Sequence, residues 1–210
     1  MSFQNVFTAI GLPPPPPPKR NVFISSFHAN RAEVDSFIHT YATLHKVFTP
    51  KALCTFDNEH FIDSDNPEYV MSQIREKYLG DASVTIVLVG KCTHSRRYVD
   101  WEIKSSLRRG QSVPNGLLAY VLPSARPSTN PITGVRAAWP HLPPRLQANW
   151  NFNRQDLSYA RYYESPGTAE QVRRAIESVV WDRTNRAHLI TNDSDMMKNN
   201  AKCRVCGICH

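Results

Sequence analysis

The sequence predicts an α/β protein in which helices flank a parallel β-sheet. Residues 83–89 are a nearly continuous run of β-branched and apolar residues, typical of a strand buried on both faces. A helical pattern follows, with Val99, Ile103 and Leu107 four residues apart. Strand and helix patterns alternate in this way along residues 21–122, which favours parallel strands joined by right-handed crossovers.

Each predicted element has a local signal of its own. Four short runs rich in β-branched or apolar residues predict strands at residues 21–27, 51–56, 83–89 and 116–122. The apolar face of the first connecting helix is expected to comprise Val34, Phe37, Ile38, Tyr41, Leu44 and Phe48. Pro67 is expected to open the second helix, where proline is favoured, and Gly80 to end it. The third helix is expected from about Ser95 to Gly110.

The simplest strand order for this alternation is 2-1-3-4, as in flavodoxin-like folds. That order puts a switch point, where ligands bind in such sheets, between the first and third strands. Phe27 and His28 follow the first strand and Thr93 follows the third. Because Glu102 lies on the next helix, we predict a ligand site formed by these two turns and that helix.

Three segments flank this predicted domain of residues 19–125. Residues 1–18 form an arm that ends in six consecutive prolines, which predict a stiff polyproline II spacer. Residues 126–186 form an extension expected to pack on the domain, first irregular and then helical from Thr168. Residues 187–210 form a polar tail with a Cys-x-x-Cys-x-x-Cys-His ending.

The composition restricts the classes of partner. Lysine and arginine number 25 against 18 acidic residues, and the net charge of +7 suits anionic partners in general. No basic arm or stacking motif favours nucleic acid, and no apolar run approaches the roughly 20 residues that span a membrane. The N-terminus lacks the pattern of a signal peptide. We therefore expect a cytoplasmic protein whose five cysteines are thiols or metal ligands.

Three segments carry a resemblance to a known family. They read Asn-Val-Phe-Ile-Ser-Ser-Phe-His at 21–28, Ser-Val-Thr-Ile-Val-Leu-Val-Gly at 83–90 and Arg-Arg-Tyr-Val-Asp-Trp-Glu-Ile at 96–103. Together they resemble the TIR-like family of Thoeris ThsB proteins over roughly residues 19–123. The resemblance implies a flavodoxin-like TIR fold.

The resemblance also implies a function in bacterial anti-phage defence. NAD would be the substrate rather than a cofactor, and the enzyme would cleave its nicotinamide–ribose bond. A phage-derived trigger would start synthesis of an ADP-ribose-derived signal that activates a partner effector. The acceptor of the ADP-ribosyl group stays open between water, an adenosine hydroxyl and another small molecule.

The same resemblance suggests roles for particular residues. Glu102 is the catalytic candidate, since a carboxylate beneath the ribose can stabilise an oxocarbenium-like cation; the alternative is an ordinary helix glutamate. The candidates for binding the substrate are Phe27, His28, Asp57, Thr93 and Arg97. They would supply ring stacking, hydrogen bonds to ribose and contacts with the pyrophosphate. A core phenylalanine and solvated turn residues are the plainer alternatives, and Asp100 and Lys104 are expected to form a solvated i, i+4 pair.

The tail contains a second candidate site. Its possible zinc ligands are Cys203, Cys206, Cys209 and His210. All four lie within eight residues, which is crowded for one tetrahedral ion. A reduced tail, a docking segment or a metal clip between subunits are therefore kept as alternatives.

Two other functions stay open at this point. TIR-like domains also serve as non-catalytic assembly modules, and the polyproline arm would suit self-association into a homo-oligomer. Nucleoside deoxyribosyltransferases are N-glycosidases that share this type of sheet and also use a glutamate. Release of nicotinamide from NAD would distinguish the first function from these two.

Overall fold

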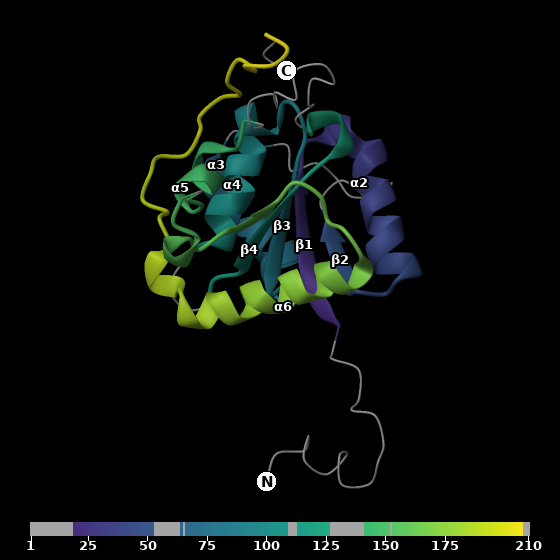
Figure 1. Ribbon diagram of the computed structural model, residues 1–210. Coiled ribbons are helices and arrows are strands. Elements are labelled where there is room, and N and C mark those ends of the chain that lie inside the picture. The colour runs from purple at the N-terminus through teal and green to yellow at the C-terminus, as the bar shows by residue number, and fades with distance from the viewer. Residues whose placement is uncertain are drawn as a thin grey trace, which may run out of the picture.

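The computed structural model describes residues 19–52, 64, 66–108, 113–126, 141–151 and 153–207. Within this part of the chain, five parallel strands form one sheet in the order β2-β1-β3-β4-β5 (Figure 1). The strands are β1 (Arg20–Ser26), β2 (Phe48–Ala52), β3 (Val84–Val89), β4 (Gly116–Val121) and β5 (Arg161–Tyr163). The predicted fold class and the order 2-1-3-4 are confirmed, and β5 adds one more strand beside β4.

Helices cover both faces of this sheet. They are α2 (Arg31–Ile38), α3 (Pro67–Ile74), α4 (Arg97–Ser106), α5 (Pro144–Ala148) and α6 (Ala169–Asn185). Wider π-helical turns continue α2 to Leu44 and α3 to Leu79. No helix in the described ranges is long and apolar enough to span a bilayer.

The hydrophobic core lies in layers on the two faces of the sheet. On one face, Phe37 of α2 and Ile176 of α6 pack on side chains such as Ile86. On the other, α4 and α5 pack on β3 and β4, and α3 packs on Trp101 of α4 and Phe23 of β1. Every residue of β3 and β4 is buried, as their apolar runs predict.

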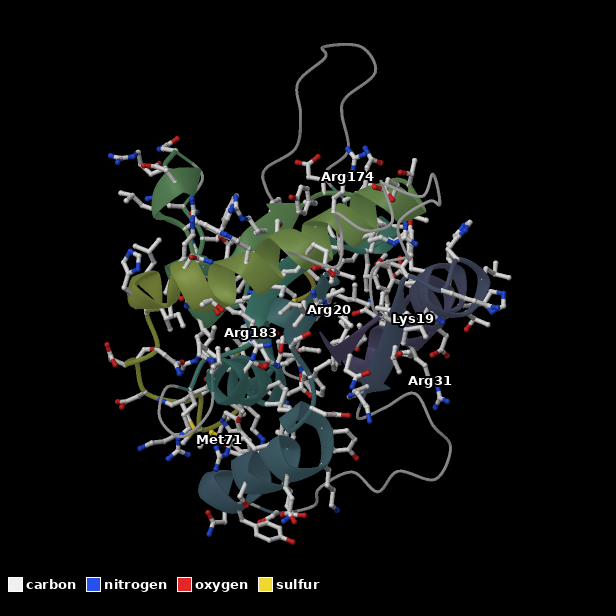
Figure 2. The ribbon with its side chains drawn as sticks, turned by 90° about the horizontal axis from the view of Figure 1, so that it is seen from below. Lys19, Arg20, Arg31, Met71, Arg174 and Arg183 are labelled. Carbon is white, nitrogen blue, oxygen red and sulfur yellow. The ribbon has the colours of Figure 1, made fainter. Side chains whose placement is uncertain are left out.

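Helix α6 crosses the sheet near the amino ends of the strands (Figure 1). Its start matches the prediction, because Thr168 and Gln171 form a capping box. Two arginines tie it to the sheet and are seen from below in Figure 2. Arg20 of β1 donates two hydrogen bonds to Glu177 at 2.9 and 2.8 Å, and Arg183 of α6 donates to the carbonyl of Pro114. The helix is thereby fixed against the beginnings of β1 and β4.

The second strand differs from its prediction. It starts at Phe48, not at residue 51, and residues 53–63, which directly follow it, lie outside the described part of the chain. Lys46 takes a positive φ of 50°, which ends the helix and lets the chain turn into the strand. Phe48 still packs on Phe37 with ring centroids 6.1 Å apart, which explains why it matched the helix pattern; Leu44, assigned to the same face, is 61% exposed.

The extension contains regular structure that was not predicted. Residues 126–167 were expected to be irregular, yet they include α5 and β5. Arg161 of β5 forms an ion pair of 2.7 Å with the buried Asp182 of α6, and Tyr163 stacks on Tyr120 at 5.7 Å. Such short elements depend on tertiary partners rather than on local pattern, so periodicity alone does not reveal them.

Gly116→Ala is expected to destabilise the fold strongly. A Cβ at this position would lie 2.2 Å from the carbonyl oxygen of Val179 and 2.6 Å from its carbonyl carbon. Since both are backbone atoms, α6 would have to move away from β4, at a cost on the order of 1–3 kcal/mol. Urea denaturation would measure this loss. Gly80→Ala is the control, because its Cβ would meet only ordinary contacts at 3.5 and 3.6 Å, and unchanged stability of Gly116→Ala would contradict the close approach.

Candidate active site

The turns that follow β1 and β3 meet at the carboxyl edge of the sheet. A Cβ on Gly90 would lie 2.2 Å from the side-chain oxygen of Asn30, so a larger residue here would have to displace the Asn30 side chain. Thr93 is fully buried, and its hydroxyl accepts a hydrogen bond of 2.8 Å from the Gly90 amide. The predicted meeting of these two turns is therefore present, and the Thr93 hydroxyl is bound within the turn.

Glu102 lies in the middle of α4, on the side of the helix that faces β1. Only 5% of the residue is exposed, and the Ser25 hydroxyl donates a hydrogen bond of 2.5 Å to its carboxylate. Burial raises the pKa of Glu102 to about 8, and the hydrogen bond from Ser25 offsets part of that rise. A carboxyl group of this kind titrates near neutral pH, which is typical of functional sites.

Phe27 and His28 lie beside one another after β1. The Phe27 ring is 6% exposed, with the exposed His28 ring edge-on at 4.5 Å and the Arg96 guanidinium 4.6 Å from its centroid. Arg96 is itself buried and donates from Nε to the carbonyl of Cys92 at 3.2 Å. A substrate ring that stacks on Phe27 would therefore have to displace the Arg96 guanidinium.

Arg97 is engaged with the tail in this structure. Its backbone amide donates to the side-chain oxygen of Asn200 at 3.0 Å, and its guanidinium lies 5.0 Å from the centroid of the Tyr98 ring and 5.3 Å from that of Trp101. Asp57, the remaining candidate for binding the substrate, lies outside the described residues. The described candidates thus gather around the start of α4, with the tail lying against them.

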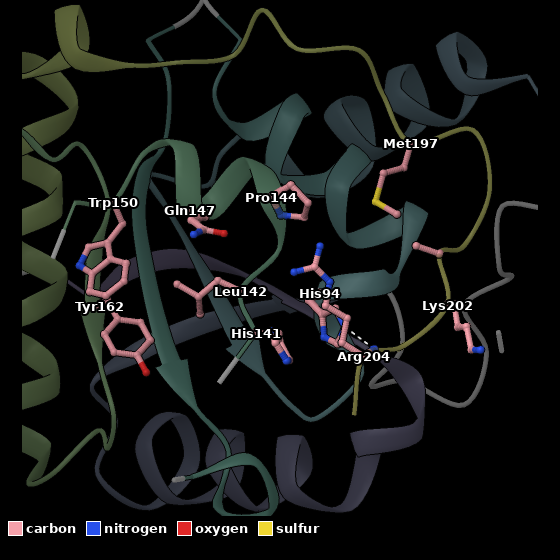
Figure 3. Close-up of a pocket in the computed structure, with 11 residues that line it drawn as sticks. His94, His141, Leu142, Pro144, Gln147, Trp150, Tyr162, Met197, Lys202 and Arg204 are labelled. Carbon is pink, nitrogen blue, oxygen red and sulfur yellow. Dashed lines mark hydrogen bonds between the residues drawn. The ribbon is translucent and has the colours of Figure 1, made fainter. Parts of the chain in front are cut away.

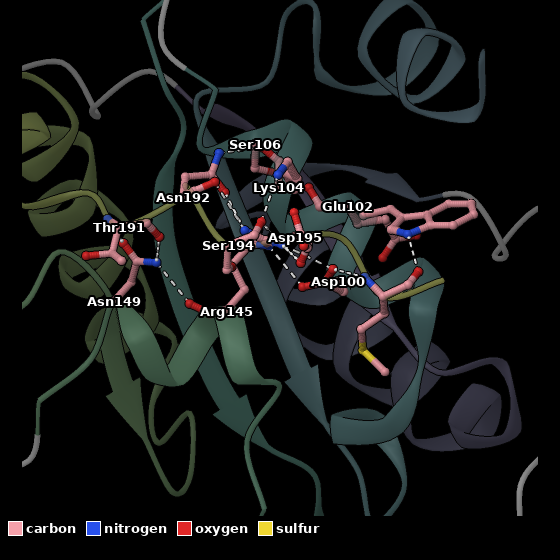
Figure 4. A network of polar contacts seen from close by, with 12 residues as sticks. Asp100, Glu102, Lys104, Ser106, Arg145, Asn149, Thr191, Asn192, Ser194 and Asp195 are labelled. Carbon is pink, nitrogen blue, oxygen red and sulfur yellow. Dashed lines mark hydrogen bonds and ion pairs between the residues drawn. The ribbon is translucent and has the colours of Figure 1, made fainter. Parts of the chain in front are cut away.

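A buried ion pair replaces the solvated pair expected of Asp100 and Lys104. Asp100 is 3% exposed and accepts from both Nε and Nη2 of Arg145 in α5, at 2.9 and 3.2 Å. Lys104 instead donates to the carbonyl of Ser194 at 2.9 Å. Asp100 and Lys104 do lie one helical turn apart on α4, but the partner of Asp100 is Arg145, which comes from the extension (Figure 4).

This ion pair belongs to a polar network that fixes the tail along α4 (Figure 4). Arg145 also donates to the carbonyls of Ser194 and Asp195, at 3.2 and 3.1 Å. Further along, Trp101 donates from its indole to the carbonyl of Met197 at 2.9 Å. The described tail is therefore packed against the same helix that carries Glu102.

A cavity of about 370 Å³ lies between the tail and the extension (Figure 3). Its walls include His94, His141, Trp150, Tyr162 and Arg204, but not Glu102. Burial, together with the nearby charges of His141 and Arg204, lowers the pKa of His94. Its Nε2 accepts a hydrogen bond of 3.1 Å from the Arg204 amide. The cavity is thus a basic, partly aromatic hollow that is separate from the glutamate.

Sequence reasoning missed the role of Ser25, the contact of Arg96 with the Phe27 ring, and the position of Cys92 beside the tail. Ser25, the hydrogen-bond donor to Glu102, directly follows the apolar run Val22-Phe23-Ile24, and a small polar residue at the end of that run was an available signal. Arg96 was distinguishable only by its place at the helix start. Cys92 is an isolated cysteine in the sequence, yet its sulfur lies near those of Cys203 and Cys206. Cys209 and His210 lie outside the described residues.

Comparison with known proteins identifies the part of the chain that holds the glutamate. The family model described as "Thoeris protein ThsB, TIR-like domain" matches residues 23–124, which include β2, β3, β4 and α4. A search of curated proteins returned no match. The matched range contains Ser25 and Glu102 but not the tail. Residues 23–124 of this chain therefore form a TIR-like domain of the Thoeris ThsB family, and this match supports a TIR-like protein of the Thoeris type.

Proposed function

We propose that the protein cleaves NAD at the bond between nicotinamide and ribose, with Glu102 as the catalytic residue. The observation that carries the proposal is the buried carboxyl group of Glu102 on α4, held by Ser25 beside the switch point. It lies within the range that matches the ThsB TIR-like family. The product would be an ADP-ribose-derived signal for a partner effector, made in response to a phage-derived trigger.

Cleavage of the nicotinamide–ribose bond requires mainly electrostatic stabilisation from the protein. When the C1′–N1 bond breaks, its electron pair leaves with nicotinamide, which departs neutral and needs no proton. The ribose is left with a positive charge shared between C1′ and the ring oxygen. An ionised Glu102 would stabilise that charge, and water or a hydroxyl would then attack C1′ and lose a proton.

The raised pKa of Glu102 fits this role. In the closed site the carboxyl group keeps its proton up to about pH 8 because burial penalises the charged form. A cationic nicotinamide ring close by would favour the ionised carboxylate instead. The positive charge of bound NAD would thus favour the ionised form of Glu102, which is the form that stabilises the ribose cation.

The packing around the site suits an enzyme that rests in a closed state. Glu102 and Phe27 are both less than a tenth exposed, and Arg96 covers the Phe27 ring. NAD would need these side chains to move before its nicotinamide ribose could reach the carboxylate. This arrangement supports the proposal that a trigger opens the site.

Product analysis after incubation with NAD tests the proposal. The protein would be assayed alone and in lysate from phage-infected cells, with nicotinamide and ADP-ribose derivatives separated by chromatography. Release of nicotinamide in the infected lysate is the expected result. Base exchange on deoxynucleosides would indicate a deoxyribosyltransferase, and absence of both reactions after infection would favour an assembly module.

A further inference from the structure

Three cysteine sulfurs from two distant parts of the chain converge at the turn after β3. The sulfur of Cys92, in that turn, lies 3.2 Å from that of Cys203 and 3.4 Å from that of Cys206, both in the tail. All three atoms lie within 4.8 Å of one another. These separations are too long for a disulfide bond of about 2.05 Å. They are close to the roughly 3.8 Å between thiolates that share one tetrahedral zinc ion with bonds of about 2.3 Å.

The backbone between the two tail cysteines is folded as a tight turn around a sulfur atom. The Val205 amide points at the Cys203 sulfur at 3.4 Å, and the Gly207 amide donates to the Cys203 carbonyl at 2.9 Å. Gly207 has a φ of +73°, a conformation that favours glycine. An amide directed at sulfur stabilises a thiolate, the form that binds metal. The turn is therefore suited to hold two thiolates side by side.

The closeness of the three sulfurs also favours a bound cation once they ionise. Cys203 is 1% exposed and Cys92 is half-buried, whereas Cys206 lies at the surface. Three thiolates gathered in so small a space would repel one another unless a positive ion lay between them. Soft thiolate ligands in a tetrahedral arrangement select zinc over calcium or magnesium.

We propose that Cys92, Cys203 and Cys206 bind one Zn²⁺ ion, which fastens the tail to the turn after β3. Binding releases the three thiol protons to solvent as three Zn–S bonds form. These three cysteines are the ligands in the described part of the chain, and the fourth position of the tetrahedron is left to solvent or to another donor. Because Cys92 supplies a ligand from outside the tail, the ion no longer depends on four ligands within eight residues.

The consequence is a tail fixed beside the helix that carries Glu102. Just before the cysteines, the Ala201 amide donates to the Ser95 carbonyl at 2.9 Å, and Asn200 accepts from the Arg97 amide at 3.0 Å. Zinc would hold the end of this segment in place. Two of the three cysteines lie outside the range that matches the TIR-like family, and the proposal does not depend on NAD cleavage.

Metal analysis of the full-length protein tests the zinc site. Protein purified under reducing conditions is expected to contain about one zinc per chain by mass spectrometry. Separate Cys92→Ser, Cys203→Ser and Cys206→Ser variants are expected to lose at least about nine-tenths of that metal after dialysis against a weak chelator. Cys54→Ser is the matched control and is expected to keep it. Undiminished zinc in Cys92→Ser would overturn the proposal.

Cobalt substitution keeps the proposal testable if a serine variant fails to fold. Wild-type protein reconstituted with Co²⁺ is expected to show thiolate-to-cobalt charge-transfer absorption and the visible bands of tetrahedral cobalt. Failure of the wild-type chain to take up either Zn²⁺ or Co²⁺ would contradict the site, as would iron in place of zinc or a disulfide between any two of the three cysteines.

Discussion

Glu102→Gln is expected to stabilise the folded protein in alkaline solution. The folded-state pKa of about 8 lies above the ordinary value of 4.5, so the buried carboxyl favours folding only while it keeps its proton. That contribution is complete below about pH 4.5 and is lost as the pH rises through about 8. Glutamine resembles the protonated acid at every pH and can still accept the hydrogen bond from Ser25.

The size and pH dependence of this gain can be measured by denaturant titration. Wild type and Glu102→Gln should be about equally stable near pH 4.5, and at about pH 9 the variant should be more stable by on the order of a few kcal/mol. Glu76→Gln, at an exposed position on the turn that continues α3, is the control. A constant difference between wild type and Glu102→Gln across this pH range would show that burial does not raise the pKa of Glu102.

Arg145→Met is expected to cause the largest loss of stability. The Arg145 side chain is 1% exposed, and its removal would leave the buried Asp100 carboxylate without its cation. It would also remove the donors to the carbonyls of Ser194 and Asp195. Breaking one side of such a buried pair costs on the order of 3–5 kcal/mol. Urea denaturation monitored by circular dichroism would give the value.

Two further variants separate the charge from the packing. The double variant Asp100→Asn with Arg145→Met should recover part of the loss, because no unpaired charge is then buried. Arg154→Ala breaks a pair with Asp156 in which both side chains are more than half exposed, and it should change stability little. Equal effects of Arg145→Met and Arg154→Ala would contradict the structural role of the buried pair.

The central strands could be predicted from sequence because a strand that is buried on both faces consists almost entirely of apolar residues. Residues 83–89 and 116–122 are apolar almost throughout, and β3 and β4 lie within one residue of these bounds. The local hydrophobic pattern predicts element boundaries less well where an apolar residue fits the spacing of one element but belongs to the next. Phe48 continued the spacing of the preceding helix and was placed on it, although the chain turns at Lys46.

The extension and the buried polar groups could not be predicted in the same way. Asp100 and its partner Arg145 are 45 residues apart in sequence, so the closer Lys104 was the only partner that helical spacing suggested. β5 is three residues long and depends on the pairing of Arg161 with Asp182. Contacts of this kind follow from the folded arrangement and leave no periodic signal.

The candidate site was predicted in outline. The turns after β1 and β3 and the helix with Glu102 do meet, because strand order alone places them together. The partners within the site came only from the structure: Ser25 on the glutamate and Arg96 over Phe27. Roles for Phe27, His28, Thr93 and Arg97 in binding NAD stay predictions.

Nicotinamide release by wild type and Glu102→Gln, measured side by side in lysate from phage-infected cells, tests the central claim most directly. The denaturant titration shows beforehand that the variant is folded, and Glu76→Gln serves again as the control. The proposed mechanism predicts release by wild type and Glu76→Gln, and a rate lower by roughly 10²–10³-fold for Glu102→Gln. Equal rates for wild type and Glu102→Gln would contradict a catalytic role for this carboxylate.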